Sequence, residues 1–429
     1  MAELKTLPSG ASSSNVAAPP TFEQWRLLAL LVAAVFINYI DRGNLSVSAS
    51  DITKELSLSP SQMGMLLSSF FWTYAACQLL SGWLIDRFDV HWVFGIGFLI
   101  WSLATAATGF VGSFGALLIF RLLLGFGESV AYPAFSKIIA SDYAENQRGT
   151  ANALIDAGSK LGPALGTLLG GLIVARYGWR YLFIILGFGA LIWLPFWVLW
   201  TPRKHTEVKA ARVIGYVPGM LEMLKVRSVW GTFFGLFCIN YAWYFMISWF
   251  PYYLIKVRHF STERMAVLGS IPFVLIGIAA MIGGTWADRL IARGGTPTRV
   301  RKTFLISGLL MNVLLLPAGM AESDTVSMGL FFIACFAFGF TTANHWAVTQ
   351  TIAGPDVAGK WTGMQNAFGN LAGVIGPWLT GIIVEKTGSF YLAFVAVAIV
   401  VVLGALSFAF MIKEIKPQQW GPQPGGAAR

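Results

Sequence analysis

The run Arg121-Leu-Leu-Leu-Gly-Phe-Gly-Glu128 places a cation and a carboxylate inside a stretch that is apolar enough to span a membrane. On an α-helix, residues seven apart lie on one face, about 10 Å apart along the axis, so Arg121 and Glu128 share a stripe. A charge near the bilayer centre costs about 2.5–3.5 kcal/mol, so this stripe should face a bundle interior or a watery cavity. Gly125 and Gly127 between the charges let a neighbouring helix or a substrate come close.

The composition of the whole chain indicates a polytopic membrane protein. Of its 429 residues, 56% are hydrophobic and 12% are charged, a balance that soluble globular proteins of this length do not show. The expected fold class is an all-α membrane protein with about twelve transmembrane helices. The predicted spans are 25–45, 61–85, 91–111, 114–140, 149–175, 181–201, 229–256, 264–288, 301–321, 326–351, 359–384 and 389–412.

In a soluble protein, the net charge of +10 would suggest a nucleic-acid partner. In this chain, the distribution of the charge along the sequence instead indicates the membrane topology. Roughly two thirds of the Lys and Arg residues fall on the side that holds both termini, so the positive-inside rule puts both termini in the cytoplasm. The richest cluster lies between the sixth and seventh spans, at Arg203, Lys204, Lys209, Arg212, Lys225 and Arg227. We interpret this cluster as a topology determinant that contacts anionic membrane lipids, and we expect no nucleic-acid partner.

The ends of the chain and its cysteines carry little chemistry. Residues 1–20 are small and polar, which predicts a disordered cytoplasmic tail, and 413–429 form a second tail. We expect no cleaved signal peptide, because the first span is long and lacks a small-residue cleavage site. Cys77, Cys238 and Cys335 each lie in a different span, so they predict neither a disulfide nor a metal site.

The chain repeats itself at half length. Gly82-Trp-Leu-Ile-Asp86-Arg87 follows the second span, and Gly284-Thr-Trp-Ala-Asp288-Arg289 follows the eighth. A second set recurs at one constant offset, since Gly149, Asn152, Ala153, Gly162 and Pro163 reappear as Gly363, Asn366, Ala367, Gly376 and Pro377. Taken singly, these motifs can be helix caps, interhelical clamps or packing kinks, so the repetition is the informative part. It predicts a six-helix half at 21–201, a cytoplasmic linker at 202–228 and a second six-helix half at 229–412, with substrate bound between the halves.

These loops, the twelve spans and the basic central loop resemble the major facilitator superfamily over nearly the whole chain. Asn38-Tyr-Ile-Asp-Arg42, together with Arg121 and Glu128, further resembles the anion:cation symporter branch of that superfamily. That branch includes bacterial carriers for galactonate, glucarate and hexuronates, and the animal sialin and vesicular glutamate transporters. The resemblance implies gating loops formed by Gly82, Asp86, Arg87, Gly284, Asp288 and Arg289.

An organic anion in a low-dielectric cavity needs fixed positive charge, and arginine offers a planar fork for a carboxylate. Arg42 and Arg121 are therefore candidate substrate-binding residues. Lys160 is a third, in the run Asp156-Ala-Gly-Ser159-Lys160, and we include Ser159 with it. Asp156 is four residues from Lys160 on a helix, so the two can instead form a self-satisfied ion pair.

Proton coupling requires an acid that changes its protonation state during the transport cycle. Asp41 and Glu128 fit, and in the family the matching carboxylates are implicated in proton coupling. We expect an exchange of partners, in which Arg121 or Arg42 pairs with a carboxylate until substrate arrives and the acid then takes a proton. The alternative is a static structural network of charges.

Other polar groups complete the predicted cavity. Tyr39 and Tyr74 can hydrogen-bond substrate hydroxyls, as matching tyrosines in the family do, or serve only packing. Asn366 and Asn370 give the C-terminal half neutral donors and acceptors. His345 and Trp346 are further candidates, to stack on a substrate or to pack in the core.

The sequence predicts a secondary active transporter that takes up a small organic anion with protons, most simply a sugar acid such as a galactonate, glucarate or hexuronate. Aromatic or aliphatic carboxylates, and uniport or export, stay open. Four scattered histidines and three isolated cysteines supply no catalytic or metal constellation, so we expect no enzyme, no metal and no cofactor beyond the coupling proton. A transporter-like receptor is the alternative of another class. We expect a monomer in a bacterial inner membrane.

Overall fold

The computed structural model describes residues 20–143, 145–201, 218–354 and 357–420, and its regular elements in these ranges are all helices. The predicted N-terminal tail, most of the central linker with Arg203, Lys204, Lys209 and Arg212, and the end of the C-terminal tail lie outside these residues.

The N-terminal half contains α1 (Phe22–Glu55), α2 (Pro60–Arg87), α3 (Val90–Thr108), α4 (Phe114–Glu128), α5 (Ala131–Asp142), α6 (Glu145–Tyr177), α7 (Trp179–Leu191) and α8 (Trp193–Trp200). After the short α9 (Met220–Met223), the C-terminal half contains α10 (Arg227–Lys256), α11 (Thr262–Ala292), α12 (Pro297–Leu310), the 3-10 turn η1 (Met311–Leu314), α13 (Leu315–Met320), α14 (Asp324–Ala353), α15 (Ala358–Thr387), α16 (Tyr391–Leu406) and the π turn η2 (Ser407–Met411).

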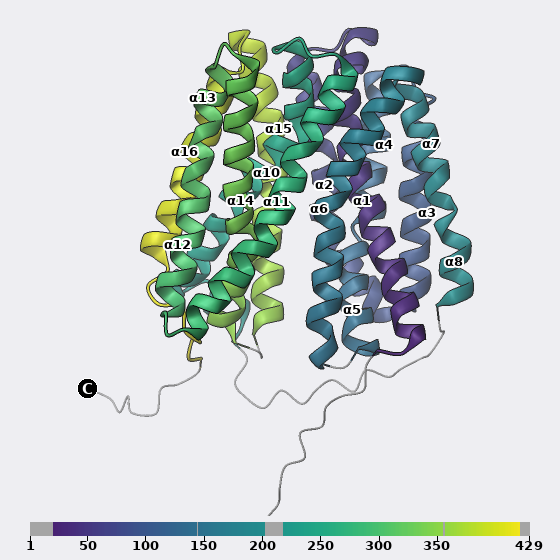
Figure 1. Cartoon of the computed structure of the whole chain (residues 1–429). Coiled ribbons are helices and arrows are strands. Elements are labelled where there is room, and N and C mark those ends of the chain that lie inside the picture. Colours follow the sequence, from purple (N-terminus) through teal and green to yellow (C-terminus); the bar gives the residue numbers. More distant parts are fainter. Residues whose placement is uncertain (1–19, 144, 202–217, 355–356, 421–429) are drawn as a thin grey trace, which may run out of the picture.

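These elements form twelve long helical rods in two groups of six, which stand side by side in Figure 1. Eleven of them, in the described residues, are long and apolar enough to cross a membrane. The twelfth, α2, has 28 residues and packs against α4 and α15. The predicted fold class, an all-α membrane protein with two six-helix halves, is therefore confirmed.

Helices begin where the sequence supplies caps. Thr21 and Ser59 each form a capping box, in which the hydroxyl accepts from the amide three residues on and the Gln24 or Gln62 side chain accepts from the cap amide. Gly178 and Gly388, which separate consecutive rods, have φ of 86° and 65°. That left-handed conformation suits glycine, so it lets one rod end and the next begin within a few residues.

Three predicted spans are interrupted within their length, and a fourth, 389–412, ends in the π turn η2. The expected helix over 114–140 ends at Glu128 and restarts at Ala131, the one over 181–201 is interrupted at Ile192, and the one over 301–321 tightens into η1. Each of the three interruptions lies just before a proline, Pro133, Pro195 or Pro317. Proline lacks the amide hydrogen and crowds the carbonyl four residues earlier, which disrupts the helix there.

The two halves meet at the end of the bundle opposite to the chain ends. Two residues in the first part of α2 donate hydrogen bonds to α15. The Ser61 amide donates to Glu385 Oε2 at 2.8 Å, and Ser68 Oγ donates to the Val374 carbonyl at 2.6 Å. A Cβ on Gly64 would lie 2.7 Å from the carbonyl oxygen of Pro377, so the backbones of α2 and α15 nearly touch. Toward the chain ends the halves diverge (Figure 1).

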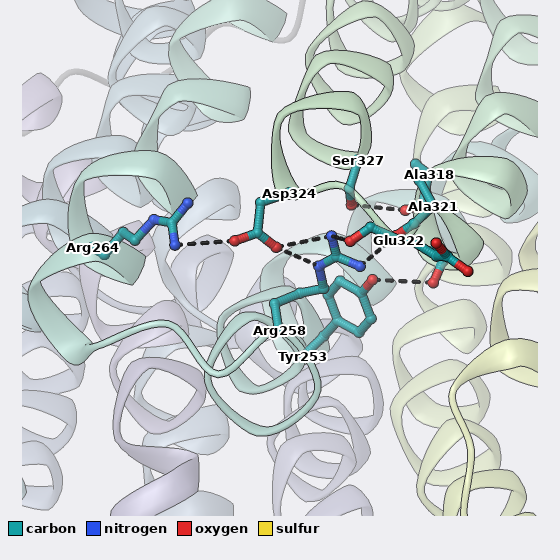
Figure 2. Close-up of polar contacts among 9 residues, drawn as sticks. Tyr253, Arg258, Arg264, Ala318, Ala321, Glu322, Asp324 and Ser327 are labelled. Atoms are coloured by element: carbon teal, nitrogen blue, oxygen red, sulfur yellow. Dashed lines mark hydrogen bonds and ion pairs between the residues drawn. The ribbon is translucent and has the colours of Figure 1, made fainter.

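A second polar network fixes the C-terminal half at this same end (Figure 2). Asp324, at the start of α14, accepts from Arg258 Nε at 3.1 Å and pairs with Arg264 Nη1 at 3.0 Å. Arg258 also donates to the carbonyl oxygen of Ala321 at 2.6 Å. These bonds tie the end of α10 and the start of α11 to the α13–α14 turn. They belong to one half, so they stabilise it without joining it to the other.

Candidate functional site

The middle of α1 carries the charged motif into the N-terminal half. Asp41 is 2% exposed and Arg42 is 8% exposed, so both side chains are buried halfway along the helix. Glu128 lies at the end of α4 with no exposed surface. Buried charges at this depth are costly and need partners.

Arg42 and Glu128 form the Arg42–Glu128 pair, with 3.0 Å between Arg42 Nε and Glu128 Oε2. Arg42 Nη2 and Glu128 Oε1 have no hydrogen-bond partner in the described part of the chain. One donor of the guanidinium fork and one carboxylate oxygen thus stay unused although both are buried. Arg42 can therefore bind a further carboxylate through Nη2 before its bond to Glu128 breaks.

Three aromatic rings surround the arginine of this pair. The guanidinium carbon of Arg42 lies 4.8 Å from the ring centroid of Tyr39, 5.0 Å from that of Phe70 and 4.6 Å from that of Tyr74. Ring faces attract a cation but take no strong hydrogen bond from it. Tyr74, which the sequence proposed as a hydroxyl ligand, is 2% exposed and stacks on Phe70 with ring centroids 5.2 Å apart.

Arg121 holds a different position from the one expected of a carboxylate partner. Its Nε donates to the Leu66 carbonyl at 3.2 Å, and its guanidinium carbon lies 5.3 Å from the Phe70 ring. Phe70 is therefore close to two guanidinium groups. Of the two arginines that the sequence offered as partners of a carboxylate, the structure pairs Arg42 with Glu128.

Glycine positions Arg121 and Glu128 by letting α4 approach its neighbours. A Cβ on Gly125 would overlap the carbonyl oxygen of Phe70 on α2. A Cβ on Gly127 would lie 2.8 Å from the amide nitrogen of Trp101 on α3. The close approach predicted from these two glycines is confirmed, and it is a neighbouring helix that fills the space.

Asp41 is held by an amide rather than by an arginine. Asn44 Nδ2 donates to Asp41 Oδ1 at 3.0 Å, and Asp41 Oδ2 has no hydrogen-bond partner among the described residues. Asp41 also interacts electrostatically with Glu128 and Arg121. The two acids that the sequence proposed for proton coupling are thus close enough to influence each other's charge.

Tyr39 connects this buried group to α6. The Tyr132 hydroxyl donates to the Tyr39 hydroxyl at 3.2 Å. Gly162 on α6 packs against Tyr39, since a Cβ there would lie 2.7 Å from Tyr39 Cβ.

Asp156, Ser159 and Lys160 lie on α6, where it faces α10 and α11 of the other half. Lys160 Nζ lies 3.6 Å from Asp156 Oδ1, and 5.3 Å from the ring centroid of Trp243 on α10. The Asp156 side chain is 61% exposed, whereas that of Lys160 is 19% exposed. Ser159 is buried and donates to the Asp156 carbonyl at 2.7 Å.

The C-terminal half contributes neutral groups. Asn370 Oδ1 accepts from the Tyr244 hydroxyl at 2.7 Å, and Asn370 Nδ2 donates to the Asn366 carbonyl at 2.9 Å. Tyr244 also contacts Phe71 of the other half, with ring centroids 4.3 Å apart. His345 on α14 is 5% exposed and lies against Trp346, with ring centroids 4.4 Å apart.

The two repeated motifs, which the sequence placed in loops after the second and eighth spans, instead form the last turns of α2 and α11. Asp288 Oδ1 accepts from Arg301 Nη2 at 2.9 Å, and Arg301 Nη1 donates to Asn344 Oδ1 at 3.1 Å, which joins α11, α12 and α14. Gly284 precedes Asp288 on α11, and Arg289 beside it is exposed. In the N-terminal half, the Asp86 side chain lies outside the described part, Gly82 has open space around it and Arg87 is exposed.

Sequence reasoning missed the aromatic residues of this site. No motif marks Phe70 near the two arginines, Tyr132 beside Tyr39, or Trp243 and Tyr244 from the other half. In a chain with 33 Phe, 17 Trp and 12 Tyr, ring content gives no local signal. Among the described residues, no group of metal-ligating side chains gathers.

Two six-helix halves that enclose buried, incompletely partnered charges define a membrane transporter. Comparison with known proteins agrees with this class. The family model described as the Major Facilitator Superfamily matches residues 31–377 and 298–429. The chain belongs to this superfamily, so it is a transporter and not an enzyme, as the sequence predicted.

Several relatives carry substrate names. A probable galactarate/D-glucarate transporter of Escherichia coli is 29% identical, over 96% of this chain and 98% of its own length. A hexuronate transporter of Bacillus subtilis is 32% identical, over 91% and 94% of the two chains. A probable sulfoacetate transporter of Cupriavidus necator is also 32% identical, over 90% and 93%.

Solved structures show the same fold. A bacterial homolog of the human lysosomal transporter Spinster, in an inward-facing and occupied conformation, matches with a TM-score of 0.78. It is 20% identical, and the match covers 92% of this chain and 97% of that one.

Proposed function

We propose that this transporter takes up a sugar acid together with protons, with Arg42 as the ligand of a substrate carboxylate and with Glu128 and Asp41 as the proton carriers. The Arg42–Glu128 pair carries the proposal, because it is buried, meets at 3.0 Å and keeps one donor and one acceptor unused. The names of the relatives, which include galactarate, D-glucarate and hexuronate transporters, support the substrate class.

The cycle follows from the charges of the pair. A substrate carboxylate that reaches Arg42 competes with Glu128 for the guanidinium. If the arginine turns to the substrate, Glu128 becomes a lone buried carboxylate, and breaking a buried pair in this way costs about 3–5 kcal/mol. Taking up a proton removes most of that cost. Substrate and proton are then bound together, which is the requirement for symport.

The proton can pass between two acids. Asp41 and Glu128 interact electrostatically, and Asp41 keeps one oxygen without a hydrogen bond in the described structure. Two neighbouring buried carboxylates do not readily ionise together. We place Asp41 as the second carrier on this ground.

The orientation is part of the proposal. The excess of Lys and Arg on the side of the termini, including Lys225 and Arg227 at the start of α10, favours cytoplasmic termini in a bacterial inner membrane. The halves diverge on that same side (Figure 1). The described conformation would then face the cytoplasm. We place the carrier there as a monomer, because each chain supplies both halves of the site.

Uptake into proteoliposomes tests the function. Radiolabelled galactarate, glucarate, a hexuronate and sulfoacetate are offered with an inward proton gradient and without one. We expect at least one sugar acid to accumulate only with the gradient, and accumulation to stop when a protonophore is added. Accumulation of sulfoacetate alone would replace the substrate class, and accumulation that ignores the proton gradient would remove the coupling.

A further inference from the structure

A second cationic position lies away from Arg42, on the surface where the halves meet. Lys160 lies on α6, and its Cβ is 3.6 Å from where a Cβ on Gly277 of α11 would be. Its ammonium lies 5.3 Å from the Trp243 ring centroid on α10. Lys160 therefore reaches two helices of the C-terminal half.

The ion pair of Lys160 with Asp156 holds the ammonium weakly. The atoms are 3.6 Å apart, which is longer than a usual charge-assisted hydrogen bond. The Asp156 side chain is 61% exposed, so water can solvate this carboxylate in place of the lysine at little cost in free energy. A buried anion would compete well for this cation, because the two would interact in a drier environment.

His345 is a second, independent sign of a ligand at this place. It is 5% exposed, and neither Nδ1 nor Nε2 has a hydrogen-bond partner in the described part of the chain. It interacts electrostatically with Lys160 and Asp156. The backbone of Thr341 and of Thr342 also interacts with this ring, but no side chain of the described residues gives it a hydrogen bond, so the buried imidazole is open to a ligand.

Tyr39 links this second position to the first. Tyr39 interacts electrostatically with both Arg42 and Lys160. Its ring centroid is 4.8 Å from the Arg42 guanidinium carbon, and its Cβ packs on Gly162, two residues after Lys160. Both cations therefore have the same tyrosine as a neighbour.

We infer that Lys160 and His345 form an anion subsite for the second carboxylate of a dicarboxylate sugar acid, whose first carboxylate binds Arg42. This inference rests on the proposed function and narrows its substrate class. A second carboxylate far from Arg42 would otherwise be buried without a counter-charge, which costs more than a terminal hydroxyl would. Lys160 and His345 therefore select the dianion over the monoanion, and Asp156 holds the lysine when the subsite is empty.

Two sugar acids of equal chain length test the subsite. Galactarate carries a carboxylate at both ends, whereas galactonate has a hydroxymethyl group at one end. Calorimetric titration of the purified full-length protein at pH 7 should show galactarate binding at least tenfold more tightly than galactonate. In Lys160→Met, galactarate affinity should fall by roughly 10- to 100-fold, the value of one charge-assisted contact, while galactonate affinity changes less than about threefold.

Three variants serve as controls. Asp156→Asn keeps the ammonium, so it should keep the preference for galactarate. Lys160→Arg keeps a cation and should keep it too. Lys386→Met removes an exposed lysine at the end of α15 and should change neither affinity. Retained galactonate binding shows that Lys160→Met is folded.

Equal wild-type affinity for the two acids would overturn the inference, and the proposed function would stand. Equal losses for both acids in Lys160→Met and in Asp156→Asn would also overturn it, because they indicate a structural ion pair. A wild type that binds neither acid would overturn the inference as well, whereas the proposed function would fall only if no sugar acid of the uptake panel accumulated.

Discussion

The guanidinium of Arg42 is surrounded by the rings of Tyr39, Phe70 and Tyr74 while a single bond joins it to Glu128. The rings offset part of the cost of burying the cation, yet they leave Arg42 Nη2 without a hydrogen-bond partner among the described residues. A second carboxylate in place of these rings would have accepted a hydrogen bond from that nitrogen. The aromatic surroundings therefore keep a buried arginine both stable and available to a substrate.

This arrangement predicts that charge alone at position 42 is insufficient. Arg42→Lys should weaken substrate binding nearly as much as Arg42→Ala, on the order of 100-fold, because an ammonium cannot hold Glu128 and a substrate carboxylate through a planar fork. Calorimetric titration of the sugar acid that accumulates in vesicles measures it. Binding by the lysine variant within a few-fold of the wild type would exclude the two-pronged role.

Glu128 should carry the coupling proton. Glu128→Gln keeps the shape and resembles the protonated acid, so the variant should bind substrate and exchange it across the membrane but lose accumulation driven by a proton gradient. Wild-type binding should weaken as pH rises, because the substrate-bound state holds more protons than the free state. In Glu128→Gln this dependence should flatten.

The same measurements on Asp41→Asn assign the second acid. If Glu128→Gln accumulates substrate like the wild type and keeps the pH dependence of binding, the coupling group is elsewhere, and Asp41 is the next candidate. The conservative replacements matter here, because a truncated side chain at either buried position would leave its partners unsatisfied.

At the scale of helices, the position of α4 depends on two glycines, whose missing side chains let the helix pack closely on its neighbours. Gly125 packs against the carbonyl oxygen of Phe70, and Gly127 packs against the backbone of α3 at Trp101. Both are one turn or less from Glu128, so the acid and its packing surface belong to the same stretch of helix. A change in packing here should move the carboxylate as well as lower stability.

Gly125→Ala should therefore destabilise the folded protein by about 1–3 kcal/mol, since the new methyl group overlaps backbone that cannot move freely. The measurement is the thermal unfolding midpoint in detergent. Gly115→Ala, on the same helix with nothing within 4 Å of the new Cβ, is the matched control and should leave the midpoint unchanged or slightly higher. Equal midpoints for the two variants would contradict this packing.

The sequence predicted the rods well, because a stretch of about 20 apolar residues has few alternatives in a membrane. It did not predict where they break. Pro133, Pro195 and Pro317 each follow a break, but Pro163, Pro251, Pro272 and Pro377 lie inside helices that continue. A proline leaves a carbonyl unsatisfied, and only the neighbouring helices decide whether the chain bends or stops there.

The sequence also could not predict which arginine pairs with Glu128, because this depends on how neighbouring helices pack. Helical spacing put Arg121 and Glu128 on one face, but residues two turns apart cannot touch unless their side chains bend toward each other. Arg42 comes from another helix and reaches Glu128 directly. Spacing within one helix identifies which face is polar, and the rotation of the neighbouring helix selects the pair.

At the scale of the whole molecule, the seam between α2 and α15 determines which side is closed. The Gly64 backbone meets Pro377, a Cβ on Gly381 would lie 2.5 Å from the Pro60 carbonyl, and the Ser61 amide bonds Glu385. These contacts involve backbone, so a small separation removes several of them together. Alternating access requires this seam to open while the diverging side closes.

Gly64→Ala should shift that balance toward the open seam, because its methyl group would lie 2.7 Å from the Pro377 carbonyl oxygen. Spin labels at Ser57 and Ser389, beyond the seam ends of α2 and α15, should report longer distances in the variant than in the wild type. Gly359→Ala, on α15 with nothing within 4 Å of the new Cβ, is the control and should leave the distances unchanged. Unaltered distances in Gly64→Ala would show that the seam does not hold this side closed.

The position of every site charge in one half has a consequence for membrane voltage. Arg42, Arg121 and Lys160 are matched in number by Asp41, Glu128 and Asp156, and all six belong to α1, α4 and α6. If this half moves as one body, its own charges cancel, and the field acts only on what it carries. A monoanion that crosses with two protons is a positive load, which an inside-negative potential favours by about 2.3 kcal/mol per 100 mV. A dianion with two protons is a neutral load, so its accumulation would follow the pH difference alone.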